Sequence, residues 1–244
     1  MERVGDGLVF ELPGGGRALF TTRADGNLSS GTGDGHERGL GRRAEMSARL
    51  GVHWLCSSEQ VHGTAVHVID RLAGTEGTSV PIEADGHATA LDGVGAMILT
   101  ADCLPVALGC NGAVAMLHAG WRGLAAGVLE EGVRVIRELA REEELLAVVG
   151  PGAGACCYEV GPEVHAAFAH ERPGTREHGS AQGRGPIPLR GRCDLRAIAH
   201  ERLLAAGVTR VKDVEACTIC DERFFSHRRE GARAGRQAGI AWLS

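Results

Sequence analysis

The sequence predicts a single domain of the mixed α/β (α+β) class, and three observations lead to this prediction. Strand-like and helix-like apolar patterns alternate along the chain. Its 244 residues contain no internal repeat and no convincing linker. The apolar share of 43% suffices for a sizeable core, and the aromatic share of 4% means that this core is mostly Val, Leu, Ile and Ala. We therefore expect one domain over residues 1–244.

The N-terminal third is predicted to hold short elements separated by polar loops. Two apolar stretches flank the turn residues PGGGR, which is typical of a hairpin, and a run rich in Gly, Asp and Arg follows. In chain order we expect strands at Leu8–Leu12 and Ala18–Thr22, a loop over 24–43, a short helix over 37–50, a strand at Val66–Ile69, and a loop with short strand pieces over 71–88.

The clearest local prediction is a hairpin whose turn is Asn111-Gly112. This dipeptide is the strongest short-range signal for a two-residue turn, and strand-like stretches flank it on both sides. With these two residues as the turn, Cys110 faces Ala113. By the same register, Pro105 faces His118.

The second half of the chain continues to alternate helical and strand patterns. Asp194 is a good N-cap for a late helix, which Gly207 closes. We expect a strand at Ala96–Thr100 before the hairpin, a helix over Leu124–Arg141, a strand at Leu145–Val149, a helix from Pro162, a mobile excursion over 171–192, a helix over Asp194–Leu204, and strands at both ends of the segment 208–244.

Charge and composition exclude several classes of protein. The formal net charge of −5 gives no reason to expect a nucleic-acid or membrane partner. The N-terminus carries Glu2, Arg3 and Asp6, unlike a signal peptide, and no stretch approaches the roughly 18 apolar residues of a membrane span. We expect a cytoplasmic protein, a monomer with oligomers left open, whose eight cysteines are free thiols or metal ligands.

The predicted hairpin brings a thiol close to a histidine. Cys103 lies two residues before Pro105 and on the same face, so it becomes a diagonal neighbour of His118, roughly 7–8 Å away before the side chains converge. Pro105 lacks an N–H and is expected to end the strand pairing or to force a bulge. The separation suits two ligands of one metal ion, or a thiol and its base.

His62, in the stretch SSEQVHGTAV, is a third candidate ligand, and Gly63 permits close approach of the backbone. Two imidazoles and one thiolate with an open fourth position describe a catalytic zinc site. Taken singly, however, each of these residues is more often a satisfied core histidine or an inert buried cysteine.

Other polar clusters carry weaker signals. Cys217 and Cys220 have redox or zinc spacing without a second CxxC, so we expect a structural role or one wall of the site. The adjacent Cys156 and Cys157 are awkward metal ligands, and the preceding GPGAG lacks the GK[ST] of a phosphate loop. Arg122, between two glycines, is a better candidate for an anion site, because guanidinium binds phosphate in a bidentate manner.

Together these stretches resemble the laccase-domain family, also called YfiH-like or multicopper polyphenol oxidoreductase-like, whose members act as purine nucleoside phosphorylases. The resemblance covers most of the chain from residue 57 to 243, and the pair TADCLP and HAGWRG is highly specific. Further matches are QVHGTAV, GPGAGACCYEVGPEV, CDLRAIAHERLLAAGV and CTICDERFFSHRREGARAGRQAGIAWL. The N-terminal TTRADGNLSSGTGD is shortened relative to the family, and a His replaces the usual Tyr in SHRR.

The resemblance implies a fold and a site. The fold would be a single domain with a β-sandwich-like centre and flanking helices, as in YfiH-like cysteine hydrolases. The zinc ligands would be His62, Cys103 and His118. The reaction would be phosphorolysis of adenosine, inosine and methylthioadenosine, with adenosine deamination in some members. The older laccase label implies copper, but one Cys and two His do not build a multicopper cluster, so zinc is favoured.

Phosphorolysis requires an anion site and a stabilised purine leaving group, with an oxocarbenium-like transition state. Zinc is expected to polarise a substrate group or to activate water for deamination. Asp102 would orient a ligand or transfer a proton to the base, or serve only as a salt bridge or turn cap. The remaining candidate substrate or phosphate contacts are Arg23, Gln60, Arg122, Arg228 and Arg229, and Gln60 is alternatively an ordinary loop amide.

Three other functions stay open. In a metal-free cysteine hydrolase, Cys103 is the nucleophile, His118 its base, and Asp102 or Gln60 the group that orients the base. The laccase label suggests polyphenol oxidation. Some relatives resemble peptidoglycan editing factors, which limit misincorporation of an amino acid into cell-wall precursors.

Overall fold

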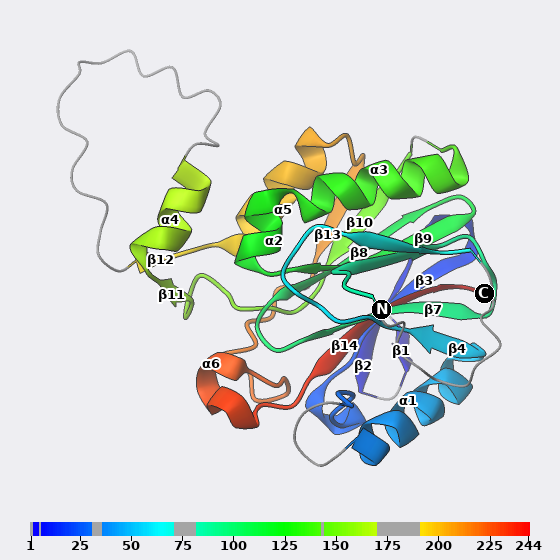
Figure 1. The fold of residues 1–244 in the computed structure, drawn as a ribbon, viewed down its shortest axis with the longest axis horizontal. Coiled ribbons are helices and arrows are strands. Elements are labelled where there is room, and N and C mark those ends of the chain that lie inside the picture. The colour runs from blue at the N-terminus through cyan, green and yellow to red at the C-terminus, as the bar shows by residue number, and fades with distance from the viewer. Residues whose placement is uncertain (1, 5, 31–35, 71–81, 143, 170–190) are drawn as a thin grey trace.

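The computed structural model describes residues 2–4, 6–30, 36–70, 82–142, 144–169 and 191–244. Two six-stranded sheets pack face to face at its centre, and helices cover both outer faces (Figure 1). The predicted mixed α/β single domain is therefore confirmed. The helices are α1 (His36–Leu50), α2 (Trp121–Ala126), α3 (Val128–Ala140), α4 (Pro162–Ala169), α5 (Leu195–Ala205) and α6 (His227–Glu230).

Both large sheets mix parallel and antiparallel neighbours. The first sheet has the order β1 (Glu2–Val4), β2 (Gly7–Glu11), β3 (Gly16–Phe20), β14 (Gln237–Leu243), β7 (Val94–Thr100), β4 (Trp54–Cys56). The second has the order β13 (Arg210–Asp213), β10 (Leu146–Val149), β8 (Leu104–Cys110), β9 (Ala113–Ala119), β6 (Gly86–Thr89), β5 (Val66–Ile69). A small separate pair joins β11 (Glu159–Val160) to β12 (Gly191–Arg192).

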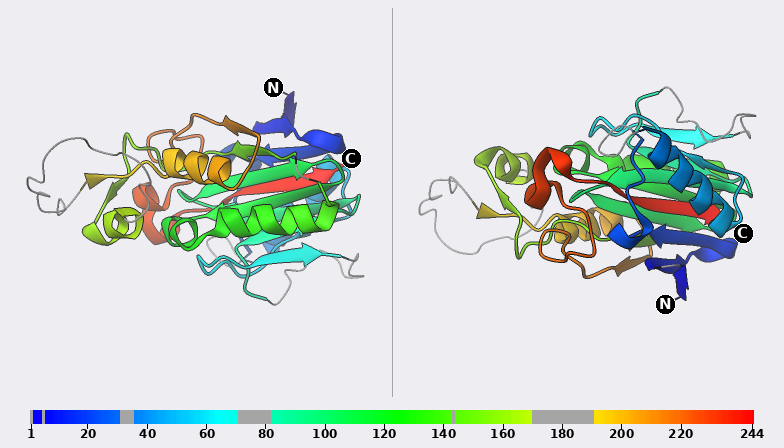
Figure 2. Two further views of the ribbon diagram at one scale, coloured as in Figure 1. Left: turned by 90° about the horizontal axis from the view of Figure 1, so that it is seen from above. Right: turned by 90° about the horizontal axis from the view of Figure 1, so that it is seen from below.

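Three apolar layers stabilise this arrangement. Between the sheets, Phe20 and Ile98 share one buried cluster with Met116 and Val148. Because side chains alternate across a strand, neighbouring residues face outward, where α3 and α5 cover the second sheet and α1 covers the first (Figure 2). The helix α3 packs so closely that a Cβ at Gly132 would lie 2.3 Å from Leu117. The strand that carries His118 is thus held on both faces.

The predicted hairpin is confirmed in its turn and its register. Cys110 pairs with Ala113 and Pro105 with His118, around a turn in which Gly112 has a φ of +91°. Pairing runs through Pro105 without a bulge and ends one residue earlier, at Leu104. The expected interruption at Pro105 is therefore wrong, because the chain leaves the sheet just before the proline, next to Cys103.

Other elements confirm or correct the sequence predictions. The hairpin of β2 and β3, the strands β5 and β10, the helix α1 and the Asp194-capped helix α5 lie where expected. The single helix over 124–141 is wrong, because Gly127 adopts a left-handed φ of +102° and divides it into α2 and α3. The loop over 24–43 is wrong from residue 36, where α1 begins, and the loop over 71–88 includes the start of β6.

Some predictions fall on residues outside the described part of the chain. These are most of the excursion over 171–192, of which 191–192 form β12, and residues 71–81 of the early loop. The strands β1 and β4 and the short helix α6 were not predicted. Within the described residues, no helix combines the length and apolar character needed to span a membrane.

Candidate metal centre and adjoining pocket

Three potential ligands meet at the end of the sandwich where α2 lies. His62 comes from the loop between β4 and β5, Cys103 from the turn that passes from the first sheet to the second, and His118 from the end of β9. Their ligand atoms lie within 4.8 Å of one another, and Cys103 Sγ lies 3.8 Å from His62 Nε2. The structure therefore brings the three predicted ligands together.

Two backbone conformations at this centre are unusual. His62 has a φ of +61° and Asp102 a φ of +94°. Residues other than Gly seldom adopt a positive φ. Such conformations persist where surrounding contacts enforce them, and they concentrate at functional sites. The Asp102 backbone is held in part by Ala153, whose N–H donates to the Asp102 carbonyl at 2.7 Å.

The glycine before α2 explains part of the motif HAGWRG. A Cβ at Gly120 would lie 2.8 Å from the His62 ring and 3.0 Å from Cys103 Sγ. Any larger residue would therefore push two of the three ligands apart. Gly123, one turn later, lets α2 approach the carbonyl oxygen of Gly63, which would lie 2.8 Å from a Cβ.

Asp85 organises the centre, although no local pattern in the sequence marks it. Its buried carboxylate lies 2.7 Å from His118 Nδ1 and accepts N–H bonds from His62 at 2.9 Å and Gly63 at 2.6 Å. One side chain thus fixes the ring of one ligand and the backbone of another. With Nδ1 occupied, His118 keeps Nε2 available for a metal, the arrangement that carboxylate–histidine–metal sites use.

The electrostatics of the centre favour a thiolate beside an imidazolium. Burial alone would raise the pKa of Cys103, but the charges and hydrogen bonds of His118 and His62 lower it to about 6. Burial would lower the pKa of His118, but Cys103 and Asp85 raise it to about 9. Burial likewise opposes ionisation of Asp85, and its hydrogen bonds from His118 and Gly63 still hold its pKa below the ordinary value.

Asp102 points away from the three ligands toward the C-terminal segment. Its carboxylate accepts hydrogen bonds from Thr218 Oγ1 and from the Arg228 backbone N–H, both at 2.7 Å. Gln60 is also engaged elsewhere, because its amide exchanges two 2.8 Å hydrogen bonds with the backbone of Leu99 in β7. The residue that orients His118 is therefore Asp85 rather than Asp102 or Gln60.

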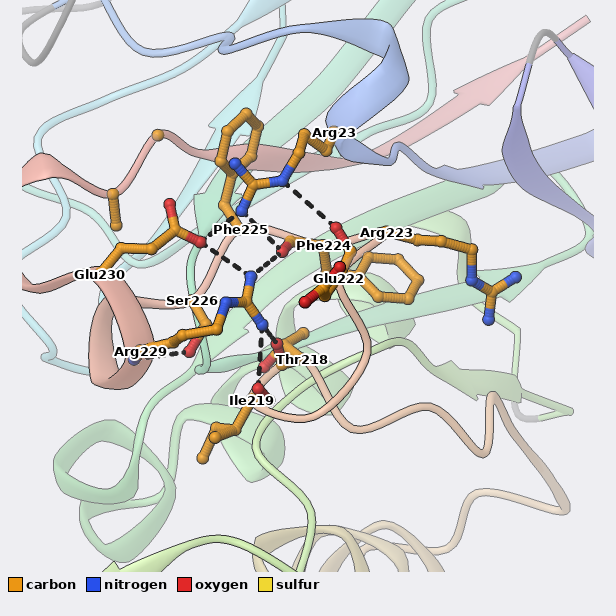
Figure 3. A network of polar contacts seen from close by, with 12 residues as sticks. Arg23, Thr218, Ile219, Glu222, Arg223, Phe224, Phe225, Ser226, Arg229 and Glu230 are labelled. Carbon is orange, nitrogen blue, oxygen red and sulfur yellow. Dashed lines mark hydrogen bonds and ion pairs between the residues drawn. The ribbon is translucent and has the colours of Figure 1, made fainter.

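The predicted phosphate-binding arginines differ in how far their guanidinium groups are already used. Arg229 donates to the carbonyl oxygens of Thr218, Ile219 and Phe224 and to Glu230 (Figure 3). Arg23 also contacts Glu230 and lies over the Phe225 ring. These two arginines hold the loop between β13 and α6 together.

Arg122 and Arg228 are less committed. The Arg122 guanidinium lies 4.4 Å from the centre of the Trp121 ring and makes no hydrogen bond or ion pair with any residue in the described ranges. Arg228 lies 5.3 Å from the centre of the Tyr158 ring and donates one bond to the Glu159 carbonyl. These two cations, unlike the previous pair, keep donors for a ligand.

A pocket of about 570 Å³ adjoins the centre. Trp121, which directly follows Gly120, lines it. Arg228 lines it too, and the backbone N–H of this residue donates to Asp102. Burial, reinforced by the charge of Cys103, raises the pKa of Tyr158 to about 12, so its phenol remains a hydrogen-bond donor at neutral pH. The lining residues are Trp121, Tyr158, Arg228 and the segment 159–164.

The donor set fits a metal ion that accepts both nitrogen and sulfur. Two imidazoles and one thiolate are typical of zinc, and three protein ligands leave a position for substrate or water. The Asp85–His118 bond supplies the outer support that metal-binding histidines usually have. A multicopper cluster needs more histidines than the two present in this group.

The fold and this centre together define a mixed α/β protein with a candidate metal site at one end of a β-sandwich. The crystal structure of a DUF152-family protein from Neisseria meningitidis superposes with a TM-score of 0.81 at 31% identity, covering 98% of this chain and 100% of that one. The model of the multi-copper polyphenol oxidoreductase laccase family matches residues 15–244. The chain belongs to this family, as its sequence motifs predicted.

Two relatives carry names that differ from the family label. A purine nucleoside phosphorylase of Xylella fastidiosa, strain Temecula1, is 40% identical over 241 residues, which is 95% of this chain and 88% of the relative. The adenosine deaminase RL5, from an unknown prokaryotic organism, is 35% identical over 225 residues, covering 86% of this chain and 84% of the relative. Both relatives thus carry the names of enzymes.

Proposed function

We propose that the chain is a zinc-dependent purine nucleoside phosphorylase. It would convert adenosine, inosine or methylthioadenosine and phosphate into the free base and ribose 1-phosphate or its methylthio analogue. The observation that carries the proposal is the His62–Cys103–His118 group together with a pocket lined by Trp121, Tyr158 and Arg228. Arg122, which follows Trp121 in α2, adds a second cation on the same helix. The relatives named purine nucleoside phosphorylase support the same reaction.

The zinc ligands would be His62 Nε2, Cys103 Sγ and His118 Nε2. Zinc would supply Lewis acidity, which polarises a substrate oxygen or a water molecule and would also serve adenosine deamination. Asp85 would keep the His118 ring and the His62 loop in place. The thiolate form of Cys103 is favoured at neutral pH, because its pKa is lowered to about 6 by the neighbouring histidines.

The pocket would bind the two substrates through different groups. Within the pocket, Trp121 and Tyr158 offer ring faces for a purine, and Arg228 offers a charged donor for phosphate. Arg122, the residue after Trp121, would supply a second charged donor from α2. A phosphate oxygen would bond to C1′ as the N-glycosidic bond breaks and its electron pair passes to the purine. The departing base needs a proton, which must come from water. Asp102, whose carboxylate accepts the backbone N–H of the pocket residue Arg228, is our candidate for passing it on.

The first test is incubation of the purified chain with inosine, with and without phosphate. We expect phosphate-dependent release of hypoxanthine and ribose 1-phosphate. In Cys103→Ser the turnover should fall by at least about 100-fold, since even outer-shell changes at metal sites cost 10–100-fold. Cys110→Ser is the matched control, because that thiol lies outside the centre and contacts the Ala113 carbonyl. Full turnover in metal-free Cys103→Ser would refute the proposal.

The phosphate site has its own test. Arg122→Gln should raise the KM for phosphate by about 10-fold or more with little change in melting temperature, because it removes a charged donor that makes no polar contact within the described residues. Arg229→Gln should instead lower the melting temperature, because its guanidinium holds three carbonyl oxygens of the β13–α6 loop and the Glu230 carboxylate of α6. Equal changes in the KM for phosphate in the two variants would contradict the assignment of phosphate binding to Arg122 and of loop stability to Arg229.

A metal-free cysteine hydrolase is the second candidate, and one observation favours it. Cys103 contacts His118, and His118 in turn contacts Asp85, as a nucleophile, its base and an orienting carboxylate would. The pKa of the thiol is lowered to about 6. Stoichiometric zinc in the purified chain would argue against this function. Ester or amide hydrolysis by the metal-free chain, lost in Cys103→Ser, would establish it.

A further inference from the structure

Four cysteines form a second thiol cluster that the proposed reaction does not use. Cys156 and Cys157 lie in a turn after β10, and Cys217 and Cys220 lie in the loop between β13 and α6. All four Sγ atoms lie within 4.8 Å of one another. We call this group the tetrathiol cluster. All of its thiols are free, and Cys156 and Cys220 are exposed.

The spacing of the sulfurs matches that of a tetrahedral metal site. With Zn–S bonds of about 2.3 Å, the sulfurs at the corners of a tetrahedron lie about 3.8 Å apart. The Sγ atoms of Cys156 and Cys220 lie 3.9 Å apart. Four sulfur donors in tetrahedral arrangement are the preferred environment of structural zinc.

The local backbone accommodates this cluster. Adjacent side chains point to opposite faces of a strand, but residues 155–157 form a turn, which allows Cys156 and Cys157 to reach one centre. The Gly154 N–H donates to Cys217 Sγ at 3.2 Å. A Cβ at Gly154 would lie 3.0 Å from the Cys217 Cβ and 3.3 Å from two sulfurs, so glycine keeps this space open.

The cluster joins two segments that border the candidate active site. Besides the sulfurs, they meet through the Thr218 N–H, which donates to the Gly152 carbonyl at 3.0 Å. Thr218, inside the CTIC turn, also holds the Asp102 carboxylate, and Tyr158 directly follows Cys157 at the pocket. Fixing the four sulfurs would therefore fix one wall of the pocket and the backbone beside Cys103.

We propose that Cys156, Cys157, Cys217 and Cys220 bind a structural zinc ion as four thiolates. This ion would be distinct from one at His62, Cys103 and His118, because the two groups share no residue. The proposal is independent of the phosphorylase assignment. It also explains why the CTIC motif lacks a second CxxC in the sequence: the other two sulfurs come from the adjacent pair in ACCYE, about sixty residues earlier.

The unaltered chain provides the first test. After purification under reductant with zinc, the chain is treated briefly with iodoacetamide, before and after removal of metal by a chelator, and labelled cysteines are identified by peptide mass spectrometry. We expect the exposed Cys156 and Cys220 to react only after chelation, while buried Cys110 and Cys193 stay unlabelled in the folded chain. Rapid labelling of Cys156 and Cys220 before chelation would overturn the proposal.

Metal content and the zinc shell provide the second test. The double variant His62→Ala/His118→Ala disables the other group, so it should retain one zinc whose X-ray absorption spectrum reports about four sulfurs at about 2.3 Å. Cys156→Ser should lose one zinc relative to the unaltered chain, whereas Cys110→Ser should lose none. A zinc-free double variant that is folded by circular dichroism, or a shell of nitrogen and oxygen, would refute the tetrathiolate site.

Discussion

Asp85 is the residue on which the candidate centre depends most. Its carboxylate binds the imidazole of one ligand and the backbone of another, so it couples two ligands that lie 56 residues apart in the chain. Burying a carboxylate is costly unless it is fully hydrogen-bonded, and here four donors compensate that cost.

We predict that Asp85→Asn weakens metal binding by about 10–100-fold, because an amide orients His118 less firmly and lacks the negative charge that supports an imidazole ligand. Competition with a chromophoric zinc chelator measures the change. Asp92→Asn is the matched control, because Asp92 is exposed and lies outside the centre. Equal zinc affinity in Asp85→Asn and the unaltered chain would show that this carboxylate does not support the metal.

The thiol of Cys103 gives a pH-dependent prediction for metal-free protein. Its pKa is lowered to about 6, so the thiolate forms as pH rises through about 6 rather than near the ordinary value of 9. The rate of Cys103 alkylation should therefore rise with pH and level off above about pH 7, as followed by peptide mass spectrometry. In Asp85→Asn the imidazolium loses support, and the midpoint should move to higher pH. A midpoint near 9 in the unaltered chain would contradict the ion pair.

At the scale of elements, the pair of helices after β9, α2 and α3, depends on the backbone conformation of Gly127 between them. The left-handed conformation of this residue ends α2, which borders the centre and the pocket, and starts α3, which packs on β9. The helical spacing of apolar residues predicted one continuous helix, because periodicity registers the buried face but not a single residue with positive φ.

We predict that Gly127→Ala destabilises the fold by roughly 1–2 kcal/mol, because an L-residue is strained at a φ of +102° even where its Cβ has room. Gly41→Ala is the control. Gly41 lies in the exposed interior of α1 with no described atom within 4 Å of its Cβ position, so alanine should stabilise by roughly 0.5–1 kcal/mol. Urea unfolding measures both, and shifts of the same sign would contradict the argument.

The whole molecule depends on the layer between its two sheets. Phe20 is fully buried there, in edge contact with Phe10, and its ring would lie 2.5 Å from a Cβ at Gly150. The first sheet thus packs directly against the chain that follows β10, close to the segment that carries the tetrathiol cluster.

Phe20→Ala should therefore lower the free energy of unfolding by about 3–5 kcal/mol through lost burial and a residual cavity. Leu204→Ala, at a helix position that is 49% exposed, should change it by less than about 0.5 kcal/mol. Denaturant titration of both variants provides the comparison. Similar effects of the two substitutions would mean that the inter-sheet layer contributes no more than a surface contact.

The sequence predicted those parts of the site that local geometry determines. The Asn111-Gly112 turn sets the register that places His118 beside the start of β8, which directly follows Cys103, and this required only the pairing rule of a hairpin. Asp85 lay in a stretch without a clear pattern, and its role depends on contacts with residues more than 20 positions away. The contact of Cys156 with Cys220 spans 64 positions, so the local spacing of each cysteine pair does not indicate that the two pairs meet.

The central position of β14 also constrains the order in which the protein can assemble. This strand separates β3 from β7 and pairs with both, yet it follows every other described strand in the sequence. During translation, the two halves of the first sheet must wait with unpaired edges until residues 237–243 leave the ribosome, and such edges readily accept a wrong strand. Completion of this sheet therefore follows the synthesis of every other described strand, and until then the two unpaired edges would be a binding target for a chaperone.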